Sequence, residues 1–128
     1  MREILFRGKR KDNGEWVYGD FVNLKDGKKL IPHIYGYGEV IPETVGQYTG
    51  LTDYKGNKIF EGDIVDVKYD IQYTGVSAER IGHFEVVFDN GCFMKKNKKG
   101  LFHFISSDVC KKVGNIYDNP EILKGGAE

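Results

Sequence analysis

Proline, cysteine and long apolar runs are all scarce in this chain of 128 residues. It has three prolines and two cysteines, and no stretch approaches the ~20 apolar residues of a membrane-spanning helix. Its N-terminal residues lack the apolar core of a secretory signal. Cys92 and Cys110 are too far apart for a Cys-x-x-Cys pair, so we expect free thiols in a reducing compartment. These absences predict a cytoplasmic protein that makes no membrane contact.

A net charge is also missing. Lys and Arg together total 19, as do Asp and Glu, so the formal net charge at pH 7 is zero. Proteins that bind DNA are usually basic overall or carry a strongly basic face. The balance therefore argues against a globally basic DNA binder, while it leaves a local basic patch open.

No window shows convincing helical periodicity, whereas glycine and aromatic residues are plentiful. The chain has 17 Gly, 8 Tyr and 8 Phe, a composition typical of short strands joined by tight turns. Five segments carry hairpin-turn chemistry, and they are residues 12–14, 26–27, 53–56, 90–91 and 97–100. Together they predict an antiparallel meander.

The turn residues also predict backbone conformations. Asn13-Gly14 supplies two residues that tolerate a positive φ, as a type I′ turn requires. Asp53 and Gly56 occupy the first and fourth positions of a predicted type I turn, with Gly56 in the left-handed conformation. Residues 97–100 repeat that pattern.

Two short helices and one long loop complete the expected elements. Residues 106–112 predict a single helical turn with Ser107 as N-cap, and residues 120–123 predict another with Asn119 as cap and Pro120 at its first position. Residues 70–78 lack strong patterning, so we expect a long hairpin loop there, between two strands.

Three ordered blocks of sequence carry a more specific signal. They are residues 43–51 (ETVGQYTGL), 56–65 (GNKIFEGDIV) and 114–123 (GNIYDNPEIL). With the opening residues 2–7 and 17–20, these blocks resemble the YopX family, which consists of small phage and prophage proteins. The resemblance covers nearly the whole chain and implies an SH3-type barrel with an N-terminal β extension. It implies no known activity, and no catalytic residue is carried over from it.

The predicted fold is therefore all-β, a small SH3-like barrel with an N-terminal β-hairpin extension. We expect the extension at residues 1–43 and the barrel at residues 44–123, with its five strands ending near Tyr117. Residues 124–128 are expected to form a flexible tail.

Basic residues gather at two predicted hairpin tips. Lys95, Lys96, Lys98 and Lys99 lie close in sequence to two aromatic residues, Phe93 and Phe102, and Arg7, Lys9, Arg10 and Lys11 form the other cluster. Cations beside stacking rings are a means by which small barrels bind nucleic acid. The alternative is that the lysines are solvated tips and the aromatic rings fill the core.

The N-terminal strands hold more apolar material than a lone hairpin can bury. A small hairpin must pack on the barrel or on another subunit, and exposed strand edges are often covered by a partner chain. We therefore expect a homo-oligomer, with a possible subunit interface at Phe6, Trp16, Tyr18 and Phe21.

Catalytic and metal-binding residues are weakly signalled. Glu43, Glu61, Asp63 and Asp66 would support acid–base chemistry if they crowded together, but turn geometry and solubility also explain them. His33, His83 and His103 do not have the spacing of metal ligands, so we expect structural or surface histidines. No catalytic residue, cofactor or metal is predicted.

Three functions remain open, in order of preference. The first is a non-enzymatic phage or prophage module that self-assembles or binds a macromolecule. The second is a nucleic-acid-binding accessory protein in phage replication or regulation. The third is an enzyme that uses the carboxylates of Glu43, Glu61 and Asp63.

Overall fold

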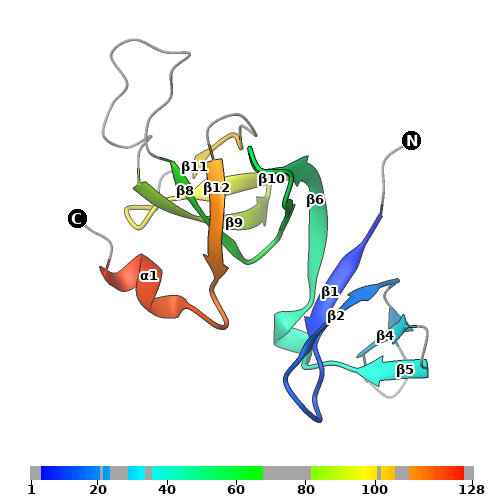
Figure 1. The fold of residues 1–128 in the computed structure, drawn as a ribbon. Coiled ribbons are helices and arrows are strands. Elements are labelled where there is room, and N and C mark those ends of the chain that lie inside the picture. Colours follow the sequence, from blue (N-terminus) through cyan, green and yellow to red (C-terminus); the bar gives the residue numbers. More distant parts are fainter. Residues whose placement is uncertain are drawn as a thin grey trace, which may run out of the picture. The chain divides into compact units, whose positions relative to one another are not determined.

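The structure is a computed structural model that describes residues 4–20, 22–23, 29–33, 36–67, 82–100, 102–105 and 110–125. The chain divides into two compact units, Met1–Gly50 and Leu51–Glu128. The elements of both units are shown in Figure 1. Among the described residues, no helix has the length and apolar character needed to cross a membrane.

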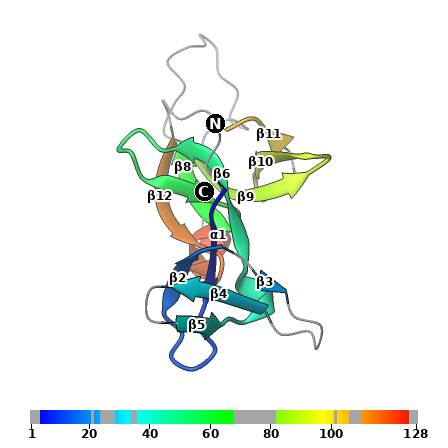
Figure 2. The ribbon, with the colours of Figure 1, turned by 90° about the vertical axis from the view of Figure 1, so that its right-hand side faces the viewer.

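The first unit is built from short antiparallel strands. The strands β1 (Phe6–Lys9) and β2 (Trp16–Gly19) form a hairpin, and β1 also pairs with the start of β6 (Gly46–Thr52). A second sheet has the order β3-β4-β5 (Figure 2). Its strands and the following 3-10 helix are β3 (Val22–Asn23), β4 (Lys29–His33), β5 (Gly36–Glu39) and η1 (Pro42–Thr44).

A close approach in the first unit depends on a glycine. A Cβ atom at Gly8 of β1 would lie 3.1 Å from the Cβ of buried Val40. Only a residue without a side chain lets this strand lie so near Val40, whose neighbour Ile41 donates a backbone hydrogen bond to the carbonyl of Lys9 at 2.9 Å.

The first predicted hairpin is confirmed, but its turn is not of type I′. Strand pairing ends at Lys9 and Trp16, which leaves a six-residue loop instead of a two-residue turn. Gly14 has a φ of 73°, whereas Asn13 does not adopt a positive φ. Its side chain instead accepts a hydrogen bond from the Glu15 amide at 3.0 Å. The turn predicted at residues 26–27 lies outside the described residues, although β3 and β4 do pair on either side of it.

The second unit contains a five-stranded antiparallel sheet with the order β11-β10-β9-β8-β12. Another strand, β7, is the sheet neighbour of β6. The elements of this unit are β7 (Lys58–Phe60), β8 (Asp63–Val67), β9 (Gly82–Asp89), β10 (Cys92–Lys96), β11 (Phe102–His103), β12 (Cys110–Asn115) and α1 (Pro120–Gly125).

One face of this sheet carries the core. Val65 and Phe84 are directly opposite each other on β8 and β9, and both are fully buried. The complete buried cluster consists of Ile59, Val65, Val67, Phe84, Val86 and Cys110. Because successive side chains of a strand point to opposite faces, Ile64 and Glu85 lie on the other face.

The remaining predicted turns are confirmed in detail. Asn90 and Gly91 have φ values of 49° and 82° and join β9 to β10 as a two-residue loop, as a type I′ turn requires. The Gly56 amide donates to the Asp53 carbonyl at 3.0 Å, and Gly56 has a φ of 88°. Gly100 repeats this geometry, with a φ of 85° and a 3.0 Å bond to the Asn97 carbonyl.

The all-β class is confirmed, but the strand order is not that of a simple meander. The last strand, β12, pairs with β8 and not with its sequence neighbour β11. The sheets formed by the described strands are open, so closure into an SH3-like barrel stays a prediction. The predicted boundary between residues 43 and 44 falls inside the first compact unit.

The helix predictions met different outcomes. Residues 110–112 belong to β12, so the helical turn predicted over residues 106–112 is wrong there. In this strand Cys110 is buried in the core, and β12 extends the sheet by pairing with β8. The helix predicted at Pro120 is confirmed as α1, which runs to Gly125, into the segment expected to be a tail. Residues 106–109 and 126–128, like the predicted loop at 70–78, lie outside the described residues.

Replacing Gly56 tests the turn. The valine substitution Gly56→Val should lower the free energy of unfolding by about 1–3 kcal/mol, because a β-branched residue is strained at a positive φ. A Cβ atom there meets nothing within 4 Å, so backbone strain alone is measured. Asn tolerates the left-handed region, and Gly56→Asn should therefore cost clearly less. Equal urea midpoints for Gly56→Val and wild type would contradict the assignment.

Candidate functional site

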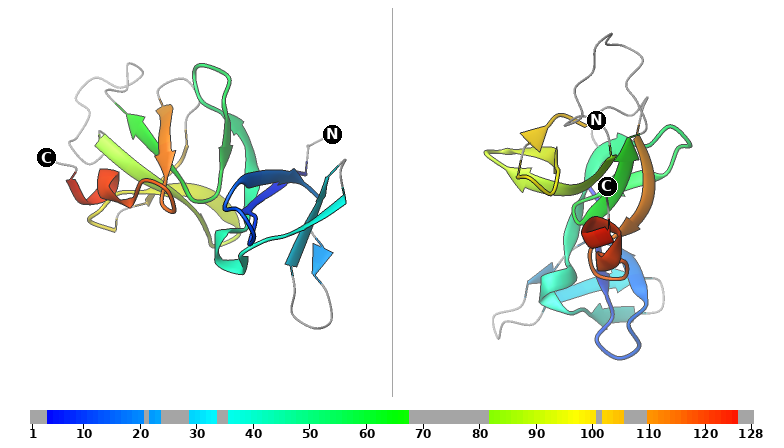
Figure 3. Two further views of the ribbon diagram at one scale, coloured as in Figure 1. Left: turned by 60° about the horizontal axis from the view of Figure 1, so that its bottom comes forward. Right: turned by 90° about the vertical axis from the view of Figure 1, so that its left-hand side faces the viewer.

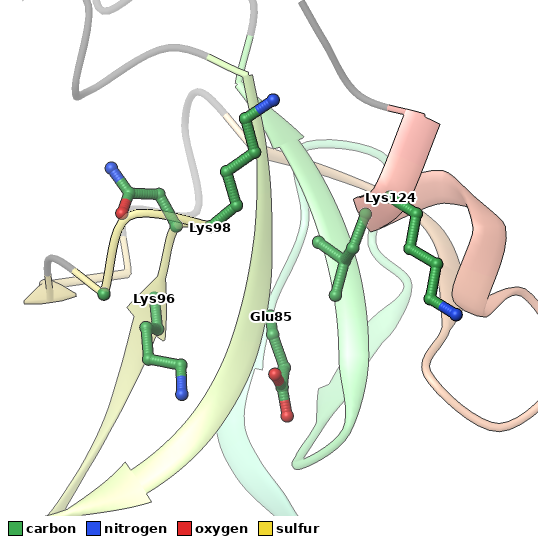
Figure 4. A pocket seen from close by; sticks show the side chains of 7 residues that line it. Glu85, Lys96, Lys98 and Lys124 are labelled. Atoms are coloured by element: carbon green, nitrogen blue, oxygen red, sulfur yellow. The ribbon is translucent and has the colours of Figure 1, made fainter.

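A groove of about 390 Å³ lies on the second unit and is a candidate site for a ligand (Figure 4). Its lining combines strand, turn and helix residues, which are Glu85, Lys96, Asn97, Lys98, Gly100, Leu123 and Lys124. Ligand pockets commonly have volumes of about 300–1,000 Å³. The groove is therefore large enough for one small organic group.

The floor of the groove is a row of residues across neighbouring strands. Lys96 of β10 is directly opposite Glu85 of β9 on one side and Phe102 of β11 on the other. Residues in direct register share one face of a sheet, and this face is the reverse of the one that carries the core. Lys96 places its Nζ 6.0 Å from the centre of the Phe102 ring, within the range of a cation–π contact.

The helix α1 forms the opposite wall and contacts β9 (Figure 3). An asparagine turn fixes where this helix begins. The Asn115 side chain accepts hydrogen bonds from the amides of Tyr117 at 3.0 Å and Asp118 at 2.9 Å. The Asn119 amide donates to the Asn115 carbonyl at 2.8 Å, and its side chain accepts from the Asn115 amide at 3.3 Å. The predicted cap residue Asn119 thus holds the turn before α1.

Gly114 is needed for this turn. A Cβ atom at position 114 would lie 2.6 Å from Oδ1 of Asn119, which is closer than real Cβ contacts allow. The block at residues 114–123 that carried the family resemblance therefore has a physical role, because it sets the position of the helical wall.

The structure divides the predicted lysine cluster. Lys95 is 5% exposed, and its Nζ lies 5.1 Å from the centre of the Phe84 ring, on the core face. As a buried residue it does not present its ammonium group to a ligand in solvent, which corrects its assignment to the contact set. Lys96 and Lys98 line the groove, and Lys99 is exposed on the same turn.

Lys124 is a groove residue that sequence reasoning missed. It projects from α1 beside the groove, while Lys96 and Lys98 come from the other side (Figure 4). In the same view Lys96 and Glu85 extend in one direction and Lys98 in the opposite one. No sequence signal marked Lys124, because it was assigned to the tail after the helix expected at residues 120–123. In the structure it lies in the last turn of α1, a position that favours cations for reasons unrelated to binding.

Aromatic side chains lie at the strand ends near the groove. Phe102 is 42% exposed and Phe104 is 79% exposed. Phe93, by contrast, packs edge-on against Phe88 with 5.0 Å between ring centres. Phe88 and Phe93 are directly opposite each other, as are Val86 and Lys95. Because each member of the first pair is two residues from a member of the second, the two aromatic rings lie on the core face with Val86. Of the two aromatic residues named for the tip, only Phe102 therefore belongs to the groove's face.

The basic cluster of the first hairpin is occupied by contacts within its own unit. The Arg7 guanidinium is buried 4.6 Å above the Trp16 ring, and Lys9 Nζ lies 5.7 Å from the same ring centre. Arg10 pairs with Asp12 at 2.7 Å, and Lys11 pairs with Glu39 at 3.4 Å. These contacts explain the cluster as part of the unit's own structure.

The residues predicted for a subunit interface differ in exposure. Phe6 and Trp16 are half-buried, whereas Tyr18 is 48% exposed. Ile4, which precedes them, is exposed as well. Phe21 lies outside the described residues.

The candidate catalytic carboxylates lie in different surroundings. Asp63 is fully buried, accepts a hydrogen bond from the Phe60 amide at 2.7 Å and pairs with Lys112 Nζ at 3.3 Å. These contacts hold the turn between β7 and β8. Glu61 is half-buried on that turn, and Glu43 is exposed on η1 of the first unit.

The described histidines and cysteines sit in separate surroundings. His83 Nε2 lies 3.7 Å from Asp66 Oδ1, and the His103 ring packs edge-on against Phe84 at 5.8 Å. The side chain of His33 lies outside the description, and the described part of the chain gathers no three His, Cys, Asp or Glu side chains suited to a metal. Burial raises the pKa of the Cys110 thiol to about 11, so this cysteine stays protonated at neutral pH.

Asp53 is a buried carboxylate with extensive hydrogen bonding. It is 2% exposed. Its Oδ1 accepts from the amides of Lys55 at 3.0 Å and Asn57 at 2.9 Å, while Oδ2 accepts from the Asn57 side chain at 3.2 Å and the Lys112 amide at 2.9 Å. Burial alone would raise the pKa of Asp53, but these hydrogen bonds outweigh it and lower the pKa below 3.8.

Fold and site together define an all-β protein that carries a lysine-lined groove beside exposed aromatic rings. The chain belongs to the YopX protein family, which matches residues 5–124. This confirms the resemblance drawn from the sequence blocks. Among curated proteins, none matches the chain.

A solved structure supports the fold as well. The chain is similar to protein EF1440 from Enterococcus faecalis, with a TM-score of 0.55 and 21% sequence identity. The match covers 96% of this chain and 99% of that chain. At this level of identity the likeness concerns the fold alone.

Removing the Asp53 carboxylate tests its structural role. Because the pKa of Asp53 is lowered on folding, its contribution to stability is complete above the unfolded-state pKa near 3.8 and is lost as pH falls through the folded-state pKa. Asp53→Asn should lower the free energy of unfolding at neutral pH by about 1.5–3 kcal/mol, and should flatten the loss of stability below pH 3.8.

The control for this experiment is Asp12→Asn. Asp12 is exposed and pairs only across a surface turn, and such pairs are worth about 0–1 kcal/mol. Urea unfolding between neutral and acidic pH measures both variants. An Asp53→Asn curve parallel to that of wild type at low pH would refute the role of this carboxylate.

Proposed function

We propose that this protein is a non-enzymatic macromolecule-binding module, and that the macromolecule is nucleic acid. The observation that carries the proposal is the groove, which is lined by Lys96 from a strand, Lys98 from a turn and Lys124 from a helix. Of the charged groups that line it, three are cations and one, Glu85, is an anion, although the whole chain has no net charge.

The chemistry of the groove supports a polyanion. Lysine ammonium groups contact phosphates and release the counterions that surround a nucleic acid, which supplies most sequence-independent affinity. Phe102 adds an exposed ring beside Lys96, and Phe104 is an exposed ring two residues further along the chain. Small β-barrels that bind nucleic acid combine the same two features.

The SH3-like barrel is part of this proposal. Ile59 of β7 is buried in the same cluster as Val65, Phe84 and Cys110 of the five-stranded sheet. Strands of two sheets thus share one core within the second unit, which is how a small barrel fills its interior. We propose that the second unit is a distorted barrel of this class, with the groove on its outer surface.

The non-enzymatic role rests on the engaged carboxylates. Asp53 and Asp63 are held by hydrogen bonds that organise turns, and this use leaves them poorly suited to proton transfer. The proposed location, the cytoplasm of a bacterial host, rests on the free thiols of Cys92 and Cys110. The proposed phage or prophage origin rests on the family resemblance.

Salt-dependent binding tests the function. Fluorescence anisotropy with labelled single- and double-stranded DNA and RNA should show affinity that falls steeply with salt. The triple variant Lys96→Ala, Lys98→Ala, Lys124→Ala should flatten the slope of log affinity against log salt by about two to three units, because each phosphate contact contributes about 0.7–0.9.

A matched control removes three other exposed lysines of the second unit. The control variant Lys55→Ala, Lys58→Ala, Lys111→Ala changes the net charge equally, but none of its positions lines the groove. Its slope should stay near that of wild type. The proposal fails if no nucleic acid binds at low salt, or if the two triple variants lose the same slope.

Self-assembly is a second candidate function, favoured by apolar exposure on the first unit. Tyr18 is 48% exposed and Ile4 is exposed further still. Exposed apolar residues near a strand edge are a common basis for contacts between identical subunits. We propose a homo-oligomer in which Tyr18 lies at the interface.

Sedimentation measures this assembly. The wild type should sediment as an oligomer at micromolar concentration, and Tyr18→Glu should shift it toward the monomer because a charge would be buried at the interface. Tyr54 is comparably exposed on the second unit, so Tyr54→Glu serves as the control and should sediment like wild type. A monomeric wild type would rule out self-assembly.

A further inference from the structure

We infer that the groove binds single-stranded nucleic acid in preference to a duplex, with an unpaired base stacked on Phe104 or Phe102. This inference rests on the proposed function and names the form of nucleic acid that the site takes. It is carried by the position of the exposed rings relative to the lysines and by the shape of the groove.

The exposed Phe102 ring and the Lys96 side chain share one face of the sheet. Phe102 is in direct register with Lys96, and Phe104 follows two residues later with 79% of its surface exposed. A ring this exposed contributes little to the core and is accessible to a binding partner. In a duplex the faces of the bases are covered by their neighbours, whereas an unpaired base offers its face to an aromatic side chain.

Beside the groove, the Nζ of Lys96 lies 6.0 Å from the centre of the exposed Phe102 ring. At the 53–56 turn, Tyr54 and Lys55 are also exposed, with Lys55 Nζ 6.0 Å from the Tyr54 ring centre. Neither Tyr54 nor Lys55 lines the groove of about 390 Å³, whereas Lys96 does. A concave cationic site tracks a flexible backbone, as in proteins that bind single strands.

The shape of the groove also favours a single strand. Gly100, which has no side chain, forms part of the rim and leaves the turn's backbone open to a ligand. The helix α1 stands on the other side with Leu123 and Lys124. A groove walled on both sides and of this volume has room for one nucleotide-sized group, which a flexible strand delivers more readily than a stiff duplex.

The experiment compares one labelled DNA strand of mixed sequence with the duplex that it forms with its complement. Anisotropy at fixed low salt should show at least about tenfold tighter binding of the strand. Phe104→Ala should weaken strand binding by about 5- to 150-fold, the range found for loss of one stacking ring. It should leave duplex binding and the salt slope unchanged, because phosphate contacts remain.

Tyr54→Ala is the matched control, since it removes an exposed ring that does not line the groove and whose exposure of 55% lies between those of Phe102 and Phe104. It should bind the strand like wild type, and thermal melts should show both variants folded. Equal affinity for strand and duplex would overturn the inference and leave the nucleic-acid function standing. Strand binding that survives Phe104→Ala and Phe102→Ala unchanged would overturn the stacking, and absence of binding to either probe would overturn the proposed function as well.

Discussion

One buried carboxylate organises the second unit. Asp53 accepts hydrogen bonds from Lys55 and Asn57 within its own hairpin and from the Lys112 amide, which lies 59 residues away in the sequence. The Tyr54 amide adds a bond to the Cys110 carbonyl at 3.2 Å. The hairpin turn thus attaches to the edge strand β12, and β12 leads directly into the asparagine turn and α1. The helical wall of the groove therefore depends on a side chain that never touches it.

Local chemistry was readable from the sequence because it involves residues close together in the chain. The Asn90-Gly91 loop, the glycines at positions 56 and 100 and the start of α1 at Pro120 all follow from the dihedral preferences of single residues. The family blocks were readable for the same reason. Two of the blocks contain a turn whose side chain bonds to the backbone of the same block, as Asp63 and Asn115 do.

Long-range pairing and side-chain direction were not readable. Lys95 and Lys96 are neighbours in sequence, but strand alternation sends one ammonium over the Phe84 ring and the other into the groove. A one-residue difference in register would have exchanged them. Likewise, nothing in residues 110–115 specifies β8 as their partner, and Lys124 joins the site only because α1 packs beside β9. The site is a product of tertiary structure assembled from separately predictable pieces.

The pairing of β12 with β8 also sets an order of events in folding. The β9–β10 hairpin closes across two residues, whereas β12 must find Asp63–Val67 across more than forty residues of chain, and loops of that length close at a greater entropic cost. The hairpins can thus form early, and the edge strand with its helix docks late. The groove would then be complete, and able to bind a ligand, only after this final step in the folding of the second unit.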